Sequence, residues 1–290
     1  MYKLNHYIPR SLLKNWGSEG ITNNQKYNGV WCYLIQEDRI FYSESKGKKA
    51  FSFAIVEDLY VPVIEGLRHI HFEGKWLSGL ENAFANFTNQ LNVDNPELRF
   101  NNLNEMTKFL MGFYSFKYRS KYDFEQVTKY LEENQDDLKK ISNSKNIHVA
   151  VLENIIHATT EMYLRNLGSE LIIAKFLTNN VIIGDRPFIY SSKGKGISWL
   201  PINPSTIISI NKWKDNNHPH FPLAYKVVSG DNSFVQSFNQ IIAQSASYWI
   251  VSHDLETLKK NIPYCIGNSN KKGSIIFEPI QTLPYGWSIE

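Results

Sequence analysis

The sequence predicts an α+β protein with a short N-terminal β element, a helical centre and a mostly antiparallel C-terminal sheet that carries a packed helix. Changes in hydrophobic period support this class. Short aromatic and β-branched runs, typical of strands, occur before about residue 76 and after 168, whereas apolar residues in between recur every three or four positions, as in helices. Hydrophobic residues make up 42% of the 290 residues, enough for a packed interior.

The first strands are expected close to the N-terminus. The runs VWCYLIQ and RIFYS, near 30–36 and 39–43, are separated by two polar residues, which predicts a hairpin. The following segment, AFSFAIVEDLY, fits either a strand or an extended connection. Before the hairpin, Pro9 is expected in the first turn of a helix that runs to Trp16, because the fixed φ of proline suits that position.

Three amphipathic helices are expected in the centre of the chain. Their apolar stripes comprise Leu77, Leu80, Phe84, Phe87 and Leu91, then Leu103, Met106, Leu110 and Phe113, and finally Val149, Leu152, Ile156, Tyr163 and Leu167. The charge-rich segment 123–142 indicates a more exposed helix or pair of helices. Gly168 is expected to end the last helix, since glycine accepts the left-handed conformation there.

The last third of the chain returns to β-branched runs. ELIIAKFL and NVIIG, joined by Thr178-Asn179-Asn180, predict a hairpin, and further strands are expected at 205–210 and 273–280. Helices are expected at 233–246 and near 255–260. We expect one compact domain over 1–290, because the opening strands are too few to bury their own face; a boundary near 168 is the alternative.

Composition and motif content limit the classes of function that the sequence can have. The net charge is +3 and the basic residues are spread thinly, which permits a nucleic-acid partner without arguing for one. The two cysteines are too few for a disulfide framework, and the sequence shows neither a secretory pattern nor an apolar stretch long enough to span a membrane. A cytoplasmic protein without a membrane partner is therefore expected. Phosphate-loop, dinucleotide-turn, zinc-protease and serine-hydrolase motifs are absent.

The histidines fall into two kinds. The pairs His69/His71 and His218/His220 lack a nearby acidic or thiolate ligand at a suggestive spacing, so ordinary surface residues are expected there. His6 instead lies with Tyr7 and Arg10 around Pro9, at the expected helix entrance. Histidine suits proton transfer near neutral pH, so His6 is a candidate general acid or base. The alternative is that His6 caps the helix or satisfies a buried carbonyl.

Two carboxylates are further candidates. Asp185 directly follows an apolar strand, where it is expected to project into a cleft; the alternative is a turn in which it bonds only local backbone. Glu81 lies on the flank of the first helical stripe, half sheltered beside the core, and Arg119 is its expected cationic partner. The alternative is a purely structural Glu–Arg pair.

Several segments resemble one family. In order they are HYIPRSLLKNW, KKAFSFAIVEDLY, GLENAFANF, FYSFKYRSKYDF, IIGDRPF with LPINPSTIISI, and SFNQIIAQSASYWIVS, and together they resemble the bacterial and phage family called domain of unknown function 4238. The resemblance implies that the family's recurring polar residues fall at His6, Tyr7, Pro9, Glu81, Arg119, Asp185 and Asn239, with either Lys117 or Arg119 as the matching base. It implies no reaction.

Two main hypotheses follow. In the first, the protein is a phosphodiester hydrolase, an RNA or DNA nuclease of toxin or phage-defence type. His6 transfers protons, Glu81 and Asp185 hold Mg²⁺ or Mn²⁺ or orient water, and Arg119 neutralises phosphoryl charge. Supporting roles fall to Tyr7, Arg10, Lys117 and Asn239. An enzyme that acts on a small nucleotide is a variant of this hypothesis.

In the second hypothesis the protein is a non-enzymatic binding or regulatory module with a protein partner. The same polar residues then clasp the N-terminus to the core. The two hypotheses differ in geometry: a hydrolase requires His6, Glu81, Arg119 and Asp185 in one open cleft.

Overall fold

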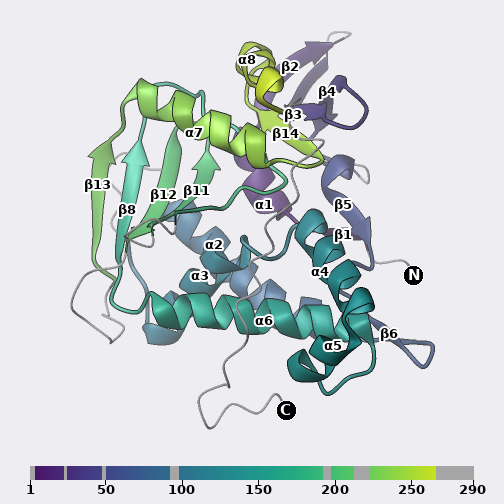
Figure 1. The fold of residues 1–290 in the computed structure, drawn as a ribbon. Coiled ribbons are helices and arrows are strands. Elements are labelled where there is room, and N and C mark those ends of the chain that lie inside the picture. Colours follow the sequence, from purple (N-terminus) through teal and green to yellow (C-terminus); the bar gives the residue numbers. More distant parts are fainter. Residues whose placement is uncertain are drawn as a thin grey trace.

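The computed structural model describes residues 4–22, 25–47, 50–91, 98–191, 197–211 and 223–265, and it has the α+β architecture predicted from the sequence (Figure 1). Two larger sheets and a group of helices make up most of the molecule. The strand expected at 273–280 and the pair His218/His220 lie outside the described residues.

The C-terminal sheet has the order β10-β11-β12-β8-β13. Its strands are β8 (Glu170–Lys175), β10 (Ile189–Ser191), β11 (Ile197–Asn203), β12 (Thr206–Asn211) and β13 (Tyr225–Ser229). Neighbouring strands are antiparallel except β13 and β8, which are parallel, so the mostly antiparallel sheet is confirmed. The expected strand at 205–210 is β12.

Helices cover both faces of this sheet. Leu171 and Ile173 of β8 belong to the hydrophobic core that includes the central helices, whereas Ala174 packs in a second cluster with Phe238 and Ile242 of α7 (Asn232–Ser245). This alternation is the period of a strand buried on both faces. In Figure 1, α7 crosses the strands of the sheet, and α6 lies beyond their lower ends. The helix predicted at 233–246 is thus confirmed, and α8 (Leu255–Cys265) extends the short helix expected near 255–260.

The second sheet joins the two ends of the described chain. Its order is β2-β3-β14-β9, and β4 pairs with β3; the strands are β2 (Ser18–Thr22), β3 (Gln25–Leu34), β4 (Arg39–Glu44), β9 (Ile183–Gly184) and β14 (Trp249–Ser252). Antiparallel pairing of Trp31 with Tyr42 and of Cys32 with Phe41 confirms the predicted β3–β4 hairpin. Strand β14 runs antiparallel to both β3 and β9, so C-terminal residues complete an N-terminal sheet.

The predicted hairpin of ELIIAKFL and NVIIG is wrong. The first run forms β8 of the C-terminal sheet, but the second supplies β9, which pairs with β14 in the other sheet. Val181, Ile182 and Ile183 are all fully buried, so this run has no polar face. It therefore lies in the interior and does not extend the sheet beside β8. Asn239 fixes this departure: it donates to the Asn180 carbonyl at 2.7 Å and accepts from the Ile182 amide at 3.1 Å.

The apolar stripes predicted for the first two central helices are buried apart from Leu103, which is 45% exposed. The stripe predicted for the third is wrong, because only Leu152 of its five residues is buried; the buried apolar residues there also include Val151, Ile155 and Met162.

The central helices themselves occur where the sequence predicts them. They are α2 (Ser78–Gln90), α3 (Leu103–Ser115), α4 (Lys121–Glu133), α5 (Gln135–Ile141) and α6 (Ile147–Arg165), so the charged segment 123–142 is a pair of helices. Side chains of Asn102, Ser120 and Asn146 cap α3, α4 and α6 by accepting backbone N–H groups. Gly168, shortly after α6, has a φ of 75°, which glycine tolerates.

The N-terminal segment is anchored to distant parts of the chain. Strand β1 (Leu4–His6) pairs antiparallel with β5 (Ile55–Glu57), which follows a 3₁₀ turn over Ser52–Ala54 and shows that the ambiguous segment contains a strand. Pro9 stands just before α1 (Arg10–Leu13), and a 3₁₀ helix (Lys14–Trp16) continues to Trp16. The indole of Trp16 donates to the carbonyl of Val181 at 2.8 Å.

A small hairpin of β6 (Val63–Ile64) and β7 (Leu67–Arg68) precedes the exposed residues His69 and His71, in agreement with the surface placement expected for that pair. Among the described residues, no helix combines the length and hydrophobicity that a membrane span requires.

Candidate functional site

A pocket of about 260 Å³ lies between the N-terminal segment and the start of α2. Residues from β1 and α1 form one wall, and residues near 60 and 73–81 form the other. Its polar lining side chains include Asn5, His6, Arg10, Tyr60, Glu73 and Glu81. Two of the predicted catalytic residues, His6 and Glu81, therefore line the same pocket.

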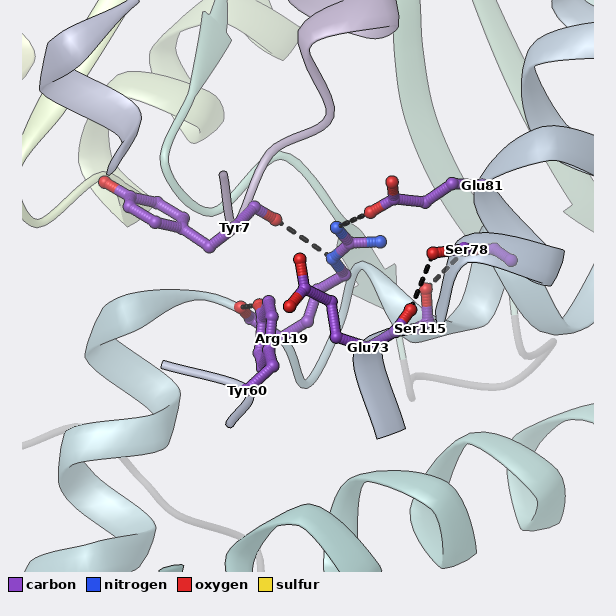
Figure 2. Close-up of polar contacts among 8 residues, drawn as sticks. Tyr7, Tyr60, Glu73, Ser78, Glu81, Ser115 and Arg119 are labelled. Carbon is purple, nitrogen blue, oxygen red and sulfur yellow. Dashed lines mark hydrogen bonds and ion pairs between the residues drawn. The ribbon is translucent and has the colours of Figure 1, made fainter. Parts of the chain in front are cut away.

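A π-helix over Phe72–Leu77 leads directly into α2 and supplies Glu73 to the pocket. Such wide helical turns are rare and frequently occur at functional sites. The hydroxyl of Ser78 donates to the carbonyl of Glu73 at 2.6 Å and closes the end of the π-helical segment (Figure 2). The irregular turn brings Glu73 to the same pocket as Glu81, although eight positions separate them.

The carboxylate of Glu81 is bound by a buried arginine. Arg119 is 1% exposed; its Nη2 forms an ion pair with Glu81 Oε1, and its Nε donates to the carbonyl of Tyr7 at 2.9 Å. Burial lowers the pKa of Arg119, but Glu81 and Tyr60 together outweigh it, so the pKa is raised and the guanidinium keeps its charge. Figure 2 shows the guanidinium between the Tyr7 carbonyl and the Glu81 carboxylate. The expected pairing is present, as both the catalytic and the structural interpretations require.

His6 is half-buried beside this pair. Its Nε2 lies 3.3 Å from the carbonyl oxygen of Ala50, and since a carbonyl only accepts, Nε2 is the donor and Nδ1 the basic nitrogen of the neutral ring. Burial lowers the pKa of His6 more than the hydrogen bond to Ala50 raises it. The imidazole is therefore held neutral near pH 7, the form that accepts a proton. The contact with a backbone carbonyl also agrees with the structural alternative for His6.

Asp185 does not line this pocket, and the expectation that it projects into an open cleft with His6 is wrong. Its side chain is fully buried, and Oδ1 accepts N–H groups from Ser247, Tyr248 and Trp249 at 2.8, 3.1 and 3.3 Å. The strand that precedes it lies beside β14, so the residues that lead into β14 cover the strand end. Burial raises the pKa of Asp185 to about 6, although the three N–H groups act in the opposite sense.

Tyr7 connects these two polar regions. Its carbonyl accepts from Arg119, and its phenol oxygen accepts from the indole N–H of Trp249. Burial and the nearby charge of Asp185 raise the pKa of Tyr7 well above its usual value. In Figure 2 the phenol points away from Glu81. The backbone carbonyl of Tyr7 thus contacts Arg119, which holds Glu81 in the pocket, and its phenol contacts Trp249, which is next to Asp185.

The residues of both polar regions fall within one known protein family. The family model described as "Protein of unknown function (DUF4238)" matches residues 5–256. The chain belongs to this family. The match covers both polar regions, from the N-terminal segment to Trp249, and confirms the resemblance noted in the sequence. Neither the curated proteins nor the solved structures contain a match to this DUF4238 chain.

Two other residues proposed for supporting roles lie elsewhere in this DUF4238 protein. The ammonium of Lys117 lies 3.9 Å from the sulfur of Met162 and above the rings of Tyr118 and Tyr190, so of the two central basic residues only Arg119 contacts Glu81. Asn239 holds the backbone between β8 and β9. Arg10, by contrast, is exposed and lines the pocket.

Sequence reasoning missed three pocket residues: Asn5, Tyr60 and Glu73. Asn5 is 2% exposed; its Oδ1 accepts the Tyr60 amide at 3.4 Å, and its Nδ2 has no hydrogen-bond partner among the residues that the structure describes. No periodic pattern marks these residues, because they meet only when β1 pairs with β5 more than 45 positions later. An unsatisfied buried donor at a pocket is a feature that a bound oxygen would complete.

The described carboxylates and histidines of the two polar regions do not form a metal site. Within the described ranges, no group of three or more His, Cys, Asp or Glu side chains is placed to hold a metal ion. Glu81 lines the pocket while Asp185 is buried outside it, so these two carboxylates do not form the pair of ligands that the sequence suggested.

Proposed function

We propose that the pocket cleaves phosphodiester bonds in RNA or DNA. The observation that carries this proposal is the shared pocket of an imidazole held neutral, a carboxylate fixed by a buried arginine, and two anion-binding donors, Arg10 and the Asn5 amide. A neutral imidazole accepts a proton from an attacking hydroxyl or water, and cationic or amide donors stabilise charge on the phosphoryl oxygens.

Each residue has a distinct role in this proposal. His6 Nδ1 is the general base, and Glu81 orients the attacking group, its rotamer fixed by Arg119. Arg10 and Asn5 bind the phosphate. Arg119 and Asp185 are positioning residues, since neither reaches the open pocket. The single open cleft of four residues that the hydrolase hypothesis required is not found, because Asp185 and Arg119 are buried outside the pocket. The proposal therefore keeps only the His6–Glu81 pair and moves the anion-binding role from Arg119 to Arg10.

The test is direct. Pure protein is incubated with end-labelled RNA and DNA, single-stranded and duplex, in EDTA, Mg²⁺ or Mn²⁺, and compared with the His6→Gln variant. General-base removal is expected to lower the cleavage rate by about 10²- to 10⁴-fold. His148→Gln is the matched control, because His148 is also half-buried, has a pKa lowered by burial, and contacts a backbone carbonyl (Leu59, 3.0 Å) outside the pocket. Equal loss in both variants would contradict a catalytic role for His6.

The biological setting is part of the same proposal. A cytoplasmic nuclease of toxin or phage-defence type is expected to arrest growth or block infection in a bacterial host that expresses the protein. His6→Gln is expected to abolish that effect, while His148→Gln retains it. Toxicity that persists in His6→Gln would separate the biological effect from the pocket.

A non-enzymatic module is the second candidate, and the clasp formed by Arg119, Glu81 and the Tyr7 carbonyl favours it. Such a clasp fastens the N-terminus without any chemistry. In that case, all substrates stay intact under every metal condition, and the protein instead retains a protein partner through the pocket face. Arg10→Ala, an exposed change, is then expected to weaken partner binding without affecting folding.

A further inference from the structure

A second polar surface lies outside the pocket, at the turn between α3 and α4. It combines three cations with three tyrosines: Lys117, Lys121, Arg186, Tyr122, Tyr190 and Tyr248. We call these six residues the cation–tyrosine surface. They come from the α3–α4 turn, the start of α4, the segment after β9, strand β10 and the approach to β14.

Each cation lies over at least one tyrosine ring, and Lys117 also lies 5.0 Å from the ring centroid of Tyr118. The ammonium of Lys117 is 4.7 Å from the ring centroid of Tyr190, and that of Lys121 is 4.4 Å from Tyr248. The guanidinium carbon of Arg186 is 4.8 Å from the ring of Tyr122. Lys121 and Arg186 have side chains 35% and 33% exposed, and Tyr190 is 38% exposed, so these groups are accessible.

The three pairs are neighbours. Arg186 forms an ion pair with Asp123 at 3.1 Å, and Asp123 lies in the first turn of α4 together with Lys121 and Tyr122. Tyr248 donates to Glu125, which lies 3.7 Å from Lys121. Arg186 and Lys121 thus each pair with a carboxylate of α4, while Lys117 lies over tyrosine rings.

The cation–tyrosine surface lies next to Arg119 and Tyr7, the residues that hold Glu81 and the N-terminal segment in place. The turn that presents Lys117 and Lys121 also sends Arg119 inward to Glu81. Tyr248 immediately precedes Trp249, whose indole contacts Tyr7. A strand bound here would lie next to the elements that position the proposed catalytic residues.

We propose that the cation–tyrosine surface binds single-stranded nucleic acid, and that single strands are therefore the substrate class of the proposed nuclease, on which this inference rests. Each nucleotide carries one phosphate and one flat base, and the surface offers one cation and one ring three times. Bases stack on tyrosine with little sequence preference, and lysine and arginine neutralise the phosphates. A duplex keeps its base faces stacked internally and cannot use the rings.

Fluorescence anisotropy follows a labelled 2′-O-methyl oligouridine of 12 nucleotides, an oligothymidine of equal length, and a duplex, at several salt concentrations. Binding is measured in the wild type and, because the oligothymidine and the duplex are themselves substrates of the proposed nuclease, repeated in the His6→Gln background, where cleavage is expected to be about 10²- to 10⁴-fold slower. The double variant Lys121→Gln/Tyr190→Ala leaves the ion pair of Arg186 with Asp123 untouched. Its matched control is Lys226→Gln/Tyr225→Ala on β13, where the tyrosine is 37% exposed and the lysine also pairs with a glutamate.

The expected results are specific. Single strands bind more tightly than the duplex, and the surface variant weakens their binding by about tenfold or more, because a stacking ring is lost. Loss of Lys121 lowers the dependence of log affinity on log salt by about 0.7. The β13 control binds as the wild type does.

Other outcomes overturn the inference. They are a wild-type protein that binds no single strand, a duplex bound equally well, or a surface variant that matches the control. Because the oligonucleotides are followed by binding alone, an inactive pocket would leave these measurements intact. Conversely, cleavage of single strands by a protein whose surface variant is unaffected would support the nuclease and reject this surface.

Discussion

The two carboxylates that the sequence singled out have opposite surroundings. Glu81 lines an open pocket with a side chain that is 30% exposed, and its partner is a buried cation, Arg119. Asp185 is fully buried, and its partners are three backbone N–H groups. An exposed, cation-bound carboxylate can meet a substrate, whereas an enclosed one organises the chain around it. In the proposed function, the Glu81 region therefore carries the chemistry and the Asp185 region organises the chain.

The largest expected effect comes from removing the Asp185 carboxylate. Asp185→Ala leaves three N–H groups without their acceptor, and the expected loss of unfolding free energy is about 3–5 kcal/mol. Asp185→Asn keeps an oxygen at the same position and should lose less. Denaturant unfolding measures both. If folded Asp185→Asn loses as much cleavage activity as His6→Gln, the comparison fails, because the buried acid then takes part in the reaction.

The pH dependence of stability separates the same two regions. Because burial raises the pKa of Asp185 to about 6, the native state binds its proton more tightly than the unfolded chain. The contribution of Asp185 is therefore fully present below about pH 4 and is lost as the pH rises towards 6, by about 3 kcal/mol. His6 and His148 have lowered pKa values and act in the opposite direction as the pH falls below their usual range.

Subtraction isolates the effect of Asp185. Unfolding free energies of wild type and Asp185→Asn, measured between pH 4 and 7, share the histidine contributions, so their difference reports on Asp185. A difference that stays flat across this range would show that the buried carboxylate remains ionised throughout.

Glu81→Gln is expected to have a moderate effect on stability and a large effect on the proposed activity. The amide oxygen can still accept from Arg119, but the buried guanidinium loses its counter-charge, which costs about 1–2 kcal/mol. Glu161→Gln is the matched control: its side chain is also 30% exposed and pairs with Arg165, which is 50% exposed. The control should lose about 0.5 kcal/mol or less. Equal losses of stability would mean that burial of Arg119 adds nothing to the pair.

Local signals account for what the sequence predicted well. The apolar stripes of α2 and α3, the β3–β4 hairpin and the β-branched run of β12 all repeat within a few residues, so these elements are predictable without knowing the fold. Helix α6 is also predicted, but its buried face lies beside the predicted stripe. The Glu81–Arg119 pair was also expected, because a half-sheltered carboxylate near the core requires a cation.

Long-range pairing accounts for what the sequence did not show. The sequence predicts that NVIIG pairs with β8, because the two runs are close in the chain. Its actual partner, β14, begins more than 60 residues later. Asn5 and Glu73 reach the pocket through a two-strand pairing and a π-helical turn, neither of which has a periodic signature. Asp185 was placed in a cleft because strand ends are often open, and here residues 246–249 cover that end.

The smallest expected effect tests whether the two regions communicate through Tyr7. Tyr7→Phe removes the acceptor of the Trp249 indole and is expected to cost about 1 kcal/mol, while the Tyr7 carbonyl still accepts from Arg119. Tyr114→Phe is the control, because Tyr114 is also 1% exposed and its hydroxyl has no hydrogen-bond partner among the described residues; that change should be close to neutral. Since the contact with Arg119 is made by the backbone, the cleavage rate of Tyr7→Phe should equal that of the wild type. A rate that falls with Tyr7→Phe but not with Tyr114→Phe would join the phenol, and through it the Asp185 region, to the chemistry of the pocket.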